Sequence, residues 1–214
     1  MPRVAARGAS LFSGMAYNAW TFPGRRPMMN RKHEAGSSLI EKEDAVLVII
    51  DMQEKLFPVM VQKEDLASQV MKLVRFSKIV GLPVVMTEQE KLGPTLSDIK
   101  AELASVPAVP KLDFDCFGCE SFVQRIQEMK RSTLILCGIE AHICVAQTAL
   151  HAAATFDVHV VADAVASRSP ENRRIALERM SHRGVTITST EMVIYELLKR
   201  AGTQTFKEVL KLVK

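Results

Sequence analysis

Three side chains in this sequence have the chemical types needed for nucleophilic catalysis. Cys144 offers a thiol, Asp51 a carboxylate that can take its proton, and Lys111 an ammonium that can hold that carboxylate. A cysteine attacks as the thiolate, so it needs a base or a lowered pKa beside it. Each residue alone also has a structural explanation, because buried cysteines and Asp–Lys ion pairs are common in proteins without catalysis.

Asp51 is expected to follow a strand, Lys111 to lie on an extended segment, and Cys144 to begin a helix. Asp51 ends the apolar run 45–50, which is typical of a strand buried on both faces. Lys111 lies on a short extended segment. Cys144 follows the predicted strand 133–137 and begins a predicted helix, whose N-terminal amides favour a thiolate. The carboxyl ends of parallel strands meet at one sheet edge, so we expect the three side chains to meet there.

Strands and helices alternate regularly along residues 43–214, which predicts one α/β domain with three α/β/α layers and a parallel sheet. Besides the segment that holds Lys111, the predicted strands are 45–50, 83–87, 133–137, 158–162 and 185–188. The predicted helices are 66–80, 97–104, 121–130, 144–155, 170–183, 191–200 and 206–213. The chain holds no GxGxxG and no GxxxxGK[ST] motif, so dinucleotide and P-loop sites lose their main support.

Residues 1–42 lack apolar periodicity, and we expect a disordered or targeting leader before the domain at 43–214. Residues 1–33 carry basic side chains and no acid, which fits an organellar transit peptide. An over-extended start, with translation beginning at Met28 or Met29, explains the same pattern. We therefore expect a cytoplasmic protein, or a mitochondrial or other organellar one if this segment is a transit peptide.

Composition argues against membrane and nucleic-acid partners. No apolar run reaches the roughly 18 residues of a membrane-spanning helix. Of the 28 basic residues, six lie in residues 1–33, so the rest of the chain carries 22 basic against 24 acidic side chains. No basic stripe follows a predicted element, and we expect neither a nucleic-acid face nor a membrane partner.

Cys116 and Cys119 form a CxxC motif, which in other proteins can bind zinc or undergo redox chemistry. A second ligand pair or a thioredoxin-like setting normally accompanies such a site. No second ligand pair is present in this sequence. Two ordinary thiols therefore explain the motif better, and a redox or zinc protein stays as an alternative.

The sequence resembles the isochorismatase-like cysteine hydrolases. The resemblance rests on the segment 48–53, on Lys111, and on the segment 138–145 with its Ala-rich helix, and it runs from about residue 45 to 214. Three further segments resemble the subgroup called isochorismatase domain-containing proteins: 88–89, 92–95 and 206–211. The resemblance implies a Rossmann-like six-stranded parallel sheet in the order 3-2-1-4-5-6, the isochorismatase-like hydrolase fold.

The same resemblance implies a catalytic triad of Asp51, Lys111 and Cys144. It also implies a cis peptide between Ile139 and Glu140, with the backbone amides of Glu140 and Cys144 forming an oxyanion hole. The expected reaction is metal-independent hydrolysis of a small amide, imide or enol-ether-like substrate through a covalent Cys144 intermediate, in a homo-oligomer. A non-catalytic binding or scaffold protein of the same fold is the alternative.

Metal binding is not expected. Nicotinamidases of this family hold a metal through an Asp-x-His motif and a further histidine, but no histidine occurs here between His33 and His142. We therefore predict no metal and no other cofactor. His142, two residues before Cys144, is expected to have a structural role or to lie on the rim of the site rather than to form a Cys–His dyad. The predicted substrate-binding residues are Gln53, Glu88, Phe114 and Phe117, and Gln89 is a further pocket candidate. Ordinary loop and core packing explains Glu88, Gln89, Phe114 and Phe117 equally well.

Overall fold

The protein is described by a computed structural model in which residues 39–213 are placed. Most of the predicted leader, residues 1–38, lies outside these residues, so the predicted transit peptide is not tested by the structure. Ile40 is already buried in the apolar core, and its backbone N–H donates to Glu196 Oε2 at 3.1 Å.

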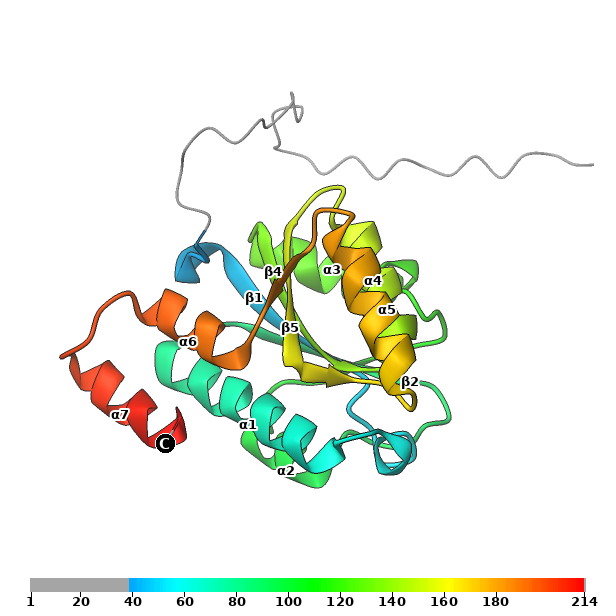
Figure 1. Cartoon of the computed structure of the whole chain (residues 1–214), viewed down its shortest axis with the longest axis horizontal. Helices are drawn as coiled ribbons and strands as arrows, with labels where there is room; N and C mark the ends of the chain where they lie inside the picture. Colours follow the sequence, from blue (N-terminus) through cyan, green and yellow to red (C-terminus); the bar gives the residue numbers. More distant parts are fainter. Residues whose placement is uncertain (1–38, 214) are drawn as a thin grey trace, which may run out of the picture. The chain divides into compact units, whose positions relative to one another are not determined.

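A six-stranded sheet forms the centre of the domain, with strand order β3-β2-β1-β4-β5-β6 (Figure 1). Every neighbouring pair is parallel. This confirms the predicted sheet and its order. The strands are β1 (Ala45–Ile50), β2 (Val84–Gln89), β3 (Ala108–Lys111), β4 (Thr133–Ile139), β5 (Asp157–Ala166) and β6 (Thr186–Thr188). The order reverses between β1 and β4, where doubly wound sheets collect their functional groups.

Helices cover both faces of the sheet, which gives the predicted three layers (Figure 1). One face carries α1 (Lys63–Val80), α2 (Ser97–Glu102), α6 (Thr190–Leu198) and α7 (Gln204–Val213), and the other carries α3 (Glu120–Met129), α4 (Ala146–Ala152) and α5 (Pro170–Ser181). Alternate residues of β1 enter the two apolar cores, with Ala45, Leu47 and Ile49 in one and Val46, Val48 and Ile50 in the other. Within residues 39–213, no helix is both long and apolar enough to cross a membrane.

Short helical turns complete the domain at η1 (Lys42–Asp44), η2 (Phe57–Val59), η3 (Cys116–Gly118) and the π-helical turn η4 (Ala141–Val145). The helix predicted to begin at Cys144 therefore begins earlier, at Ala141. The carbonyl oxygen of Glu140 explains this start, because it accepts hydrogen bonds from the backbone N–H groups of Ile143 at 3.0 Å and Val145 at 3.2 Å. Cys144 lies inside the first turns of this continuous helix rather than at its first residue.

Gly138 allows β4 to pass close to the end of β1. It pairs with Ile50 in the sheet and has a φ of +119°. A Cβ atom at this position would lie 2.0 Å from the carbonyl oxygen of Ile50, which no real side chain tolerates. Only glycine therefore fits here, and the loop that leads to Cys144 begins directly beside the strand that leads to Asp51.

Candidate active site

Asp51 is the first residue after β1 and is completely buried. Its φ of 50° lies in the left-handed region, which costs a non-glycine residue roughly 1–2 kcal/mol. The backbone N–H of Asp51 donates to the carbonyl oxygen of Thr87 on β2 at 3.3 Å. Residues held in such a conformation cluster at functional sites, because the surrounding structure must compensate for the cost.

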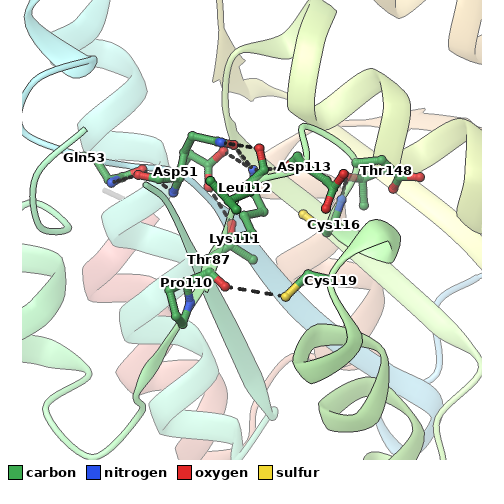
Figure 2. Close-up of polar contacts among 12 residues, drawn as sticks. Asp51, Gln53, Thr87, Pro110, Lys111, Leu112, Asp113, Cys116, Cys119 and Thr148 are labelled. Carbon is green, nitrogen blue, oxygen red and sulfur yellow. Dashed lines mark hydrogen bonds and ion pairs between the residues drawn. The ribbon is translucent and has the colours of Figure 1, made fainter. Parts of the chain in front are cut away.

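Lys111, at the end of β3, forms a buried ion pair with Asp51 (Figure 2). The distance from Nζ to Asp51 Oδ2 is 2.7 Å, and both side chains are 0% exposed. Nζ also donates to Gln89 Oε1 at 2.7 Å and to the carbonyl oxygen of Asp113 at 3.2 Å. Burial lowers the pKa of Lys111, but the charge of Asp51 and the contact with it outweigh burial and raise the pKa above its usual value. Lys111 is therefore charged at neutral pH.

The two oxygens of the Asp51 carboxylate have different surroundings. Oδ1 accepts a hydrogen bond of 2.7 Å from the hydroxyl of Thr87, which is also buried. Oδ2 meets Lys111 as an ion pair but accepts no hydrogen bond of ordinary geometry from the described residues. A buried carboxylate oxygen in this state can take a further proton donor.

Cys144 lies in η4 and is 5% exposed. The pKa of its thiol is raised to about 12, first by burial and then by the negative charge of Asp51, while the Lys111 ammonium lowers it. The expectation that helix amides favour a thiolate is therefore not met in the resting protein. The thiol keeps its proton at neutral pH, and the neighbouring carboxylate is the group that can take it.

The segment between β4 and Cys144 is held by polar contacts of Glu140. The peptide bond between Ile139 and Glu140 is cis. The buried Glu140 carboxylate accepts hydrogen bonds from the backbone N–H of Arg168 at 3.0 Å and from its Nε at 3.0 and 3.2 Å. His142 faces the same side, with Nδ1 2.9 Å from Ser167 Oγ. These contacts hold the segment that carries the predicted oxyanion-hole amides against the residues that follow β5. They also place His142 against Ser167.

Gln53 and Glu88, two of the predicted substrate-binding residues, make contacts that shape the loop after β2. Gln53 Nε2 donates to the carbonyl oxygens of Gln89 at 3.0 Å and Gly93 at 2.6 Å, and its Oε1 accepts from Gln89 N at 2.8 Å. Glu88 Oε1 accepts from both N and Oγ1 of Thr95, each at 2.7 Å. These side chains therefore hold the loop that borders Lys111.

Phe114 and Phe117, the other two predicted substrate-binding residues, lie on the segment between β3 and α3. Phe114 is 54% exposed. Phe117 packs edge-on against Phe122, with ring centroids 5.3 Å apart, and stacks on His151 at 4.9 Å. His151 Nδ1 also lies 2.7 Å from Asp115 Oδ2, so the segment is anchored to α4.

Cys116 and Cys119 are both free thiols. Cys116 is buried, and its backbone N–H donates to Thr148 Oγ1 at 3.0 Å. Cys119 is partly exposed, and its Sγ donates to the carbonyl oxygen of Pro110 at 3.5 Å (Figure 2). Within residues 39–213, no group of three or more His, Cys, Asp or Glu side chains is arranged to hold a metal ion.

Sequence reasoning missed the contact between Thr87 and Asp51 and that between Gln89 and Lys111. The position of residues 87–89 at the carboxyl end of the apolar strand β2 was the available signal. Two cavities of about 510 and 330 Å³ lie elsewhere, and neither is lined by Asp51, Lys111 or Cys144. The buried polar cluster, rather than either cavity, is therefore the candidate site.

Comparison with known proteins gives consistent matches. The family model described as isochorismatase domain matches residues 45–192. Isochorismatase domain-containing protein 2 of Danio rerio is 36% identical over 183 residues, which cover 84% of this chain and 91% of the relative. The MAR1 ribonuclease of Caenorhabditis elegans has a TM-score of 0.77 and 32% identity over 82% of this chain and 92% of its own. YcaC of Escherichia coli, described as an octameric hydrolase of unknown specificity, shares the fold with a TM-score of 0.78, 24% identity, and coverage of 83% and 91%.

Proposed function

The chain belongs to the isochorismatase family, and on this basis we propose that it is a metal-independent cysteine hydrolase of small amides, imides or enol-ether-like compounds. The observation that carries the proposal is the buried pair of Asp51 and Lys111 beside a protonated thiol. Asp51 Oδ2 lies 2.7 Å from Lys111 Nζ, and the pKa of Cys144 is raised first by burial and then by the charge of Asp51. Charge coupling of this kind supports direct proton exchange between thiol and carboxylate.

Asp51 acts first as a general base. It takes the proton of Cys144 as Sγ bonds to the substrate carbonyl carbon, and the carbonyl becomes an oxyanion. The ammonium of Lys111 pairs with Asp51 Oδ2 at 2.7 Å before this step. The backbone N–H groups of Glu140 and Cys144 are proposed to donate to the oxyanion, and the clamp between Glu140 and Arg168 supports a fixed geometry for them.

Collapse of this intermediate breaks the bond from carbon to the leaving nitrogen. Asp51 returns its proton to that nitrogen, which leaves a thioester on Cys144. A water molecule then attacks the thioester carbon and gives a proton to Asp51. The acid product departs as the carbon–sulfur bond breaks, and the thiol regains its proton.

The proposed substrate site is bordered by the loops after β2 and β3. Phe114 and Phe117 supply apolar surface, whereas Gln53 and Glu88 act by holding the loop. A small substrate suits a nucleophile that is only 5% exposed. We also propose a homo-oligomer, which light scattering of the purified protein would test. The proposed compartment is the cytoplasm, or an organelle if residues 1–33 direct import.

RNA cleavage is a second candidate, because one similar structure is named a ribonuclease. The charge balance of 22 basic against 24 acidic residues beyond residue 33 gives RNA little electrostatic attraction. The burial of Cys144 also disfavours a polymer. A non-catalytic scaffold is the third candidate, and the buried charge pair beside a thiol argues against it, since such a pair is costly to keep.

A panel of small amides and imides, with a short RNA included, tests the proposal directly. We expect turnover of at least one small substrate and a mass increase on Cys144 that matches its acyl group. Cys144→Ser and Asp51→Asn should fold and lose turnover. Full activity in Cys144→Ala would refute the mechanism, and cleavage of RNA alone would favour the second candidate.

A further inference from the structure

We propose that Thr87 is a positioning residue that fixes the Asp51 carboxylate, so that Oδ2 is the oxygen that receives the Cys144 proton. The inference rests on the proposed hydrolase function, and it concerns a residue for which sequence reasoning gave no role.

Thr87 holds Asp51 through both its backbone and its side chain. Its hydroxyl donates to Oδ1 at 2.7 Å, and its carbonyl oxygen accepts from the Asp51 N–H at 3.3 Å. The terminal torsion of an aspartate side chain is broad, so a carboxylate without fixed partners turns easily. A hydroxyl on one oxygen and an ammonium on the other remove this freedom.

The register of the sheet explains why Thr87 occupies this place. Ile50 and Thr87 are paired neighbours in β1 and β2, so Asp51 leaves β1 directly beside the Thr87 side chain. Gln89 lies two residues further along β2, and alternate residues of a strand point to the same face. Its Oε1 accepts from Lys111 Nζ at 2.7 Å. One strand therefore contacts both members of the ion pair.

Thr87 contributes no net charge, so the variants must separate its hydrogen bond from the shape of its side chain. Valine has the shape of threonine without the donor, and serine keeps the donor. If Thr87 fixes the carboxylate, Thr87→Val should let Asp51 turn and weaken its influence on the Cys144 thiol, whereas Thr87→Ser should preserve it. The charged or titratable groups that act on this thiol are Asp51, Lys111 and Cys116.

The experiment measures the rate of iodoacetamide alkylation of Cys144 against pH, by peptide mass spectrometry. All variants carry Cys119→Ser, because Cys119 is the partly exposed thiol. The matched control is Thr188→Val, since Thr188 is a buried threonine at the end of β6 whose hydroxyl has no hydrogen-bond partner among the described residues.

Thr87→Val should move the alkylation profile to lower pH and raise the rate at pH of about 9 by roughly three- to tenfold, since one pKa unit changes the thiolate fraction tenfold. Thr87→Ser and Thr188→Val should keep the parent profile. With a substrate in hand, Thr87→Val should lower kcat at nearly constant KM. If Thr87→Val does not fold, Thr87→Ala replaces it.

A parent-like alkylation profile in Thr87→Val, or an equal shift in Thr188→Val, would overturn the inference. This readout is independent of turnover. If Cys144→Ala retains hydrolysis, the proposed function fails while the alkylation profiles still decide whether Thr87 fixes Asp51. If hydrolysis needs Cys144 but the profile of Thr87→Val is unchanged, only the role of Thr87 fails.

Discussion

Asp51 Oδ2 lies 2.7 Å from Lys111 Nζ, and neither side chain is exposed to solvent. Asp51 follows β1, whereas Lys111 ends β3, two strands away in the sheet. Strand β2 lies between their strands and contributes a polar contact to each. The pair is therefore part of a fixed network that β1, β2 and β3 build together.

Removal of Lys111 should be strongly destabilising. Lys111→Met leaves the Asp51 carboxylate buried without its counter-charge, and we expect a loss of about 3–5 kcal/mol in the free energy of unfolding. Urea denaturation at neutral pH measures this loss. The double variant Asp51→Asn/Lys111→Met should recover much of it. A double variant no more stable than Lys111→Met would contradict the buried ion pair.

Asp51→Asn should separate thiol reactivity from turnover. The negative charge of Asp51 raises the pKa of Cys144, so its removal should lower that pKa from about 12 while Lys111 continues to favour the thiolate. Alkylation of Cys144 should become faster at pH of about 9, although hydrolysis is lost with the base. Asp163→Asn is the control, because Asp163 accepts hydrogen bonds from Thr190 and is not part of the site. Slower alkylation in Asp51→Asn would disprove the coupling.

Arg168→Ala should disturb the geometry of the segment that carries the proposed oxyanion-hole amides. It removes the side-chain donor to the buried Glu140 carboxylate, and we expect a cost of about 1 kcal/mol in stability and a lower kcat at similar KM. Arg174→Ala is the control, since Arg174 forms exposed ion pairs with Glu171 and Glu178, whose contribution is small. Thermal unfolding and steady-state kinetics provide both readouts. Equal effects of the two variants would argue against a role for the clamp.

Gly138→Ala should prevent normal folding around the site. The new Cβ would lie 2.0 Å from the Ile50 carbonyl oxygen, and the φ of +119° is strained for alanine. We expect a loss of more than ~3 kcal/mol. Gly81→Ala and Gly184→Ala also have positive φ but meet no atom within 4 Å, so each should cost only about 1 kcal/mol. Similar denaturation midpoints for all three variants would mean that the contact at Gly138 is relaxed in solution.

The fold was predictable because its signals are local. The apolar run of β1 and the regular alternation of strand and helix lead to a three-layer parallel sheet, and the resemblance supplies the strand order. The meeting of Asp51 and Lys111 followed from the rule that parallel strands end at one edge.

The contacts around these residues were not predictable, because they depend on the register between neighbouring strands and on how deeply each side chain is buried. Thr87 reaches Asp51 only because Ile50 pairs with Thr87 in the sheet. The raised pKa of Cys144 depends on its burial, which the sequence alone does not reveal. The start of the helix at Ala141 depends on the orientation of the Glu140 carbonyl group.

The three oxygens around Lys111 Nζ have a consequence for ligand selection. Nζ donates to two protein oxygens and forms an ion pair with Asp51 Oδ2 at 2.7 Å. A carboxylate or phosphate of a ligand would thus meet an ammonium whose charge is already balanced by the buried Asp51 carboxylate. Discrimination among ligands at this point should follow size and hydrogen-bonding pattern, and an uncharged carbonyl compound should be preferred over an anionic one of the same shape.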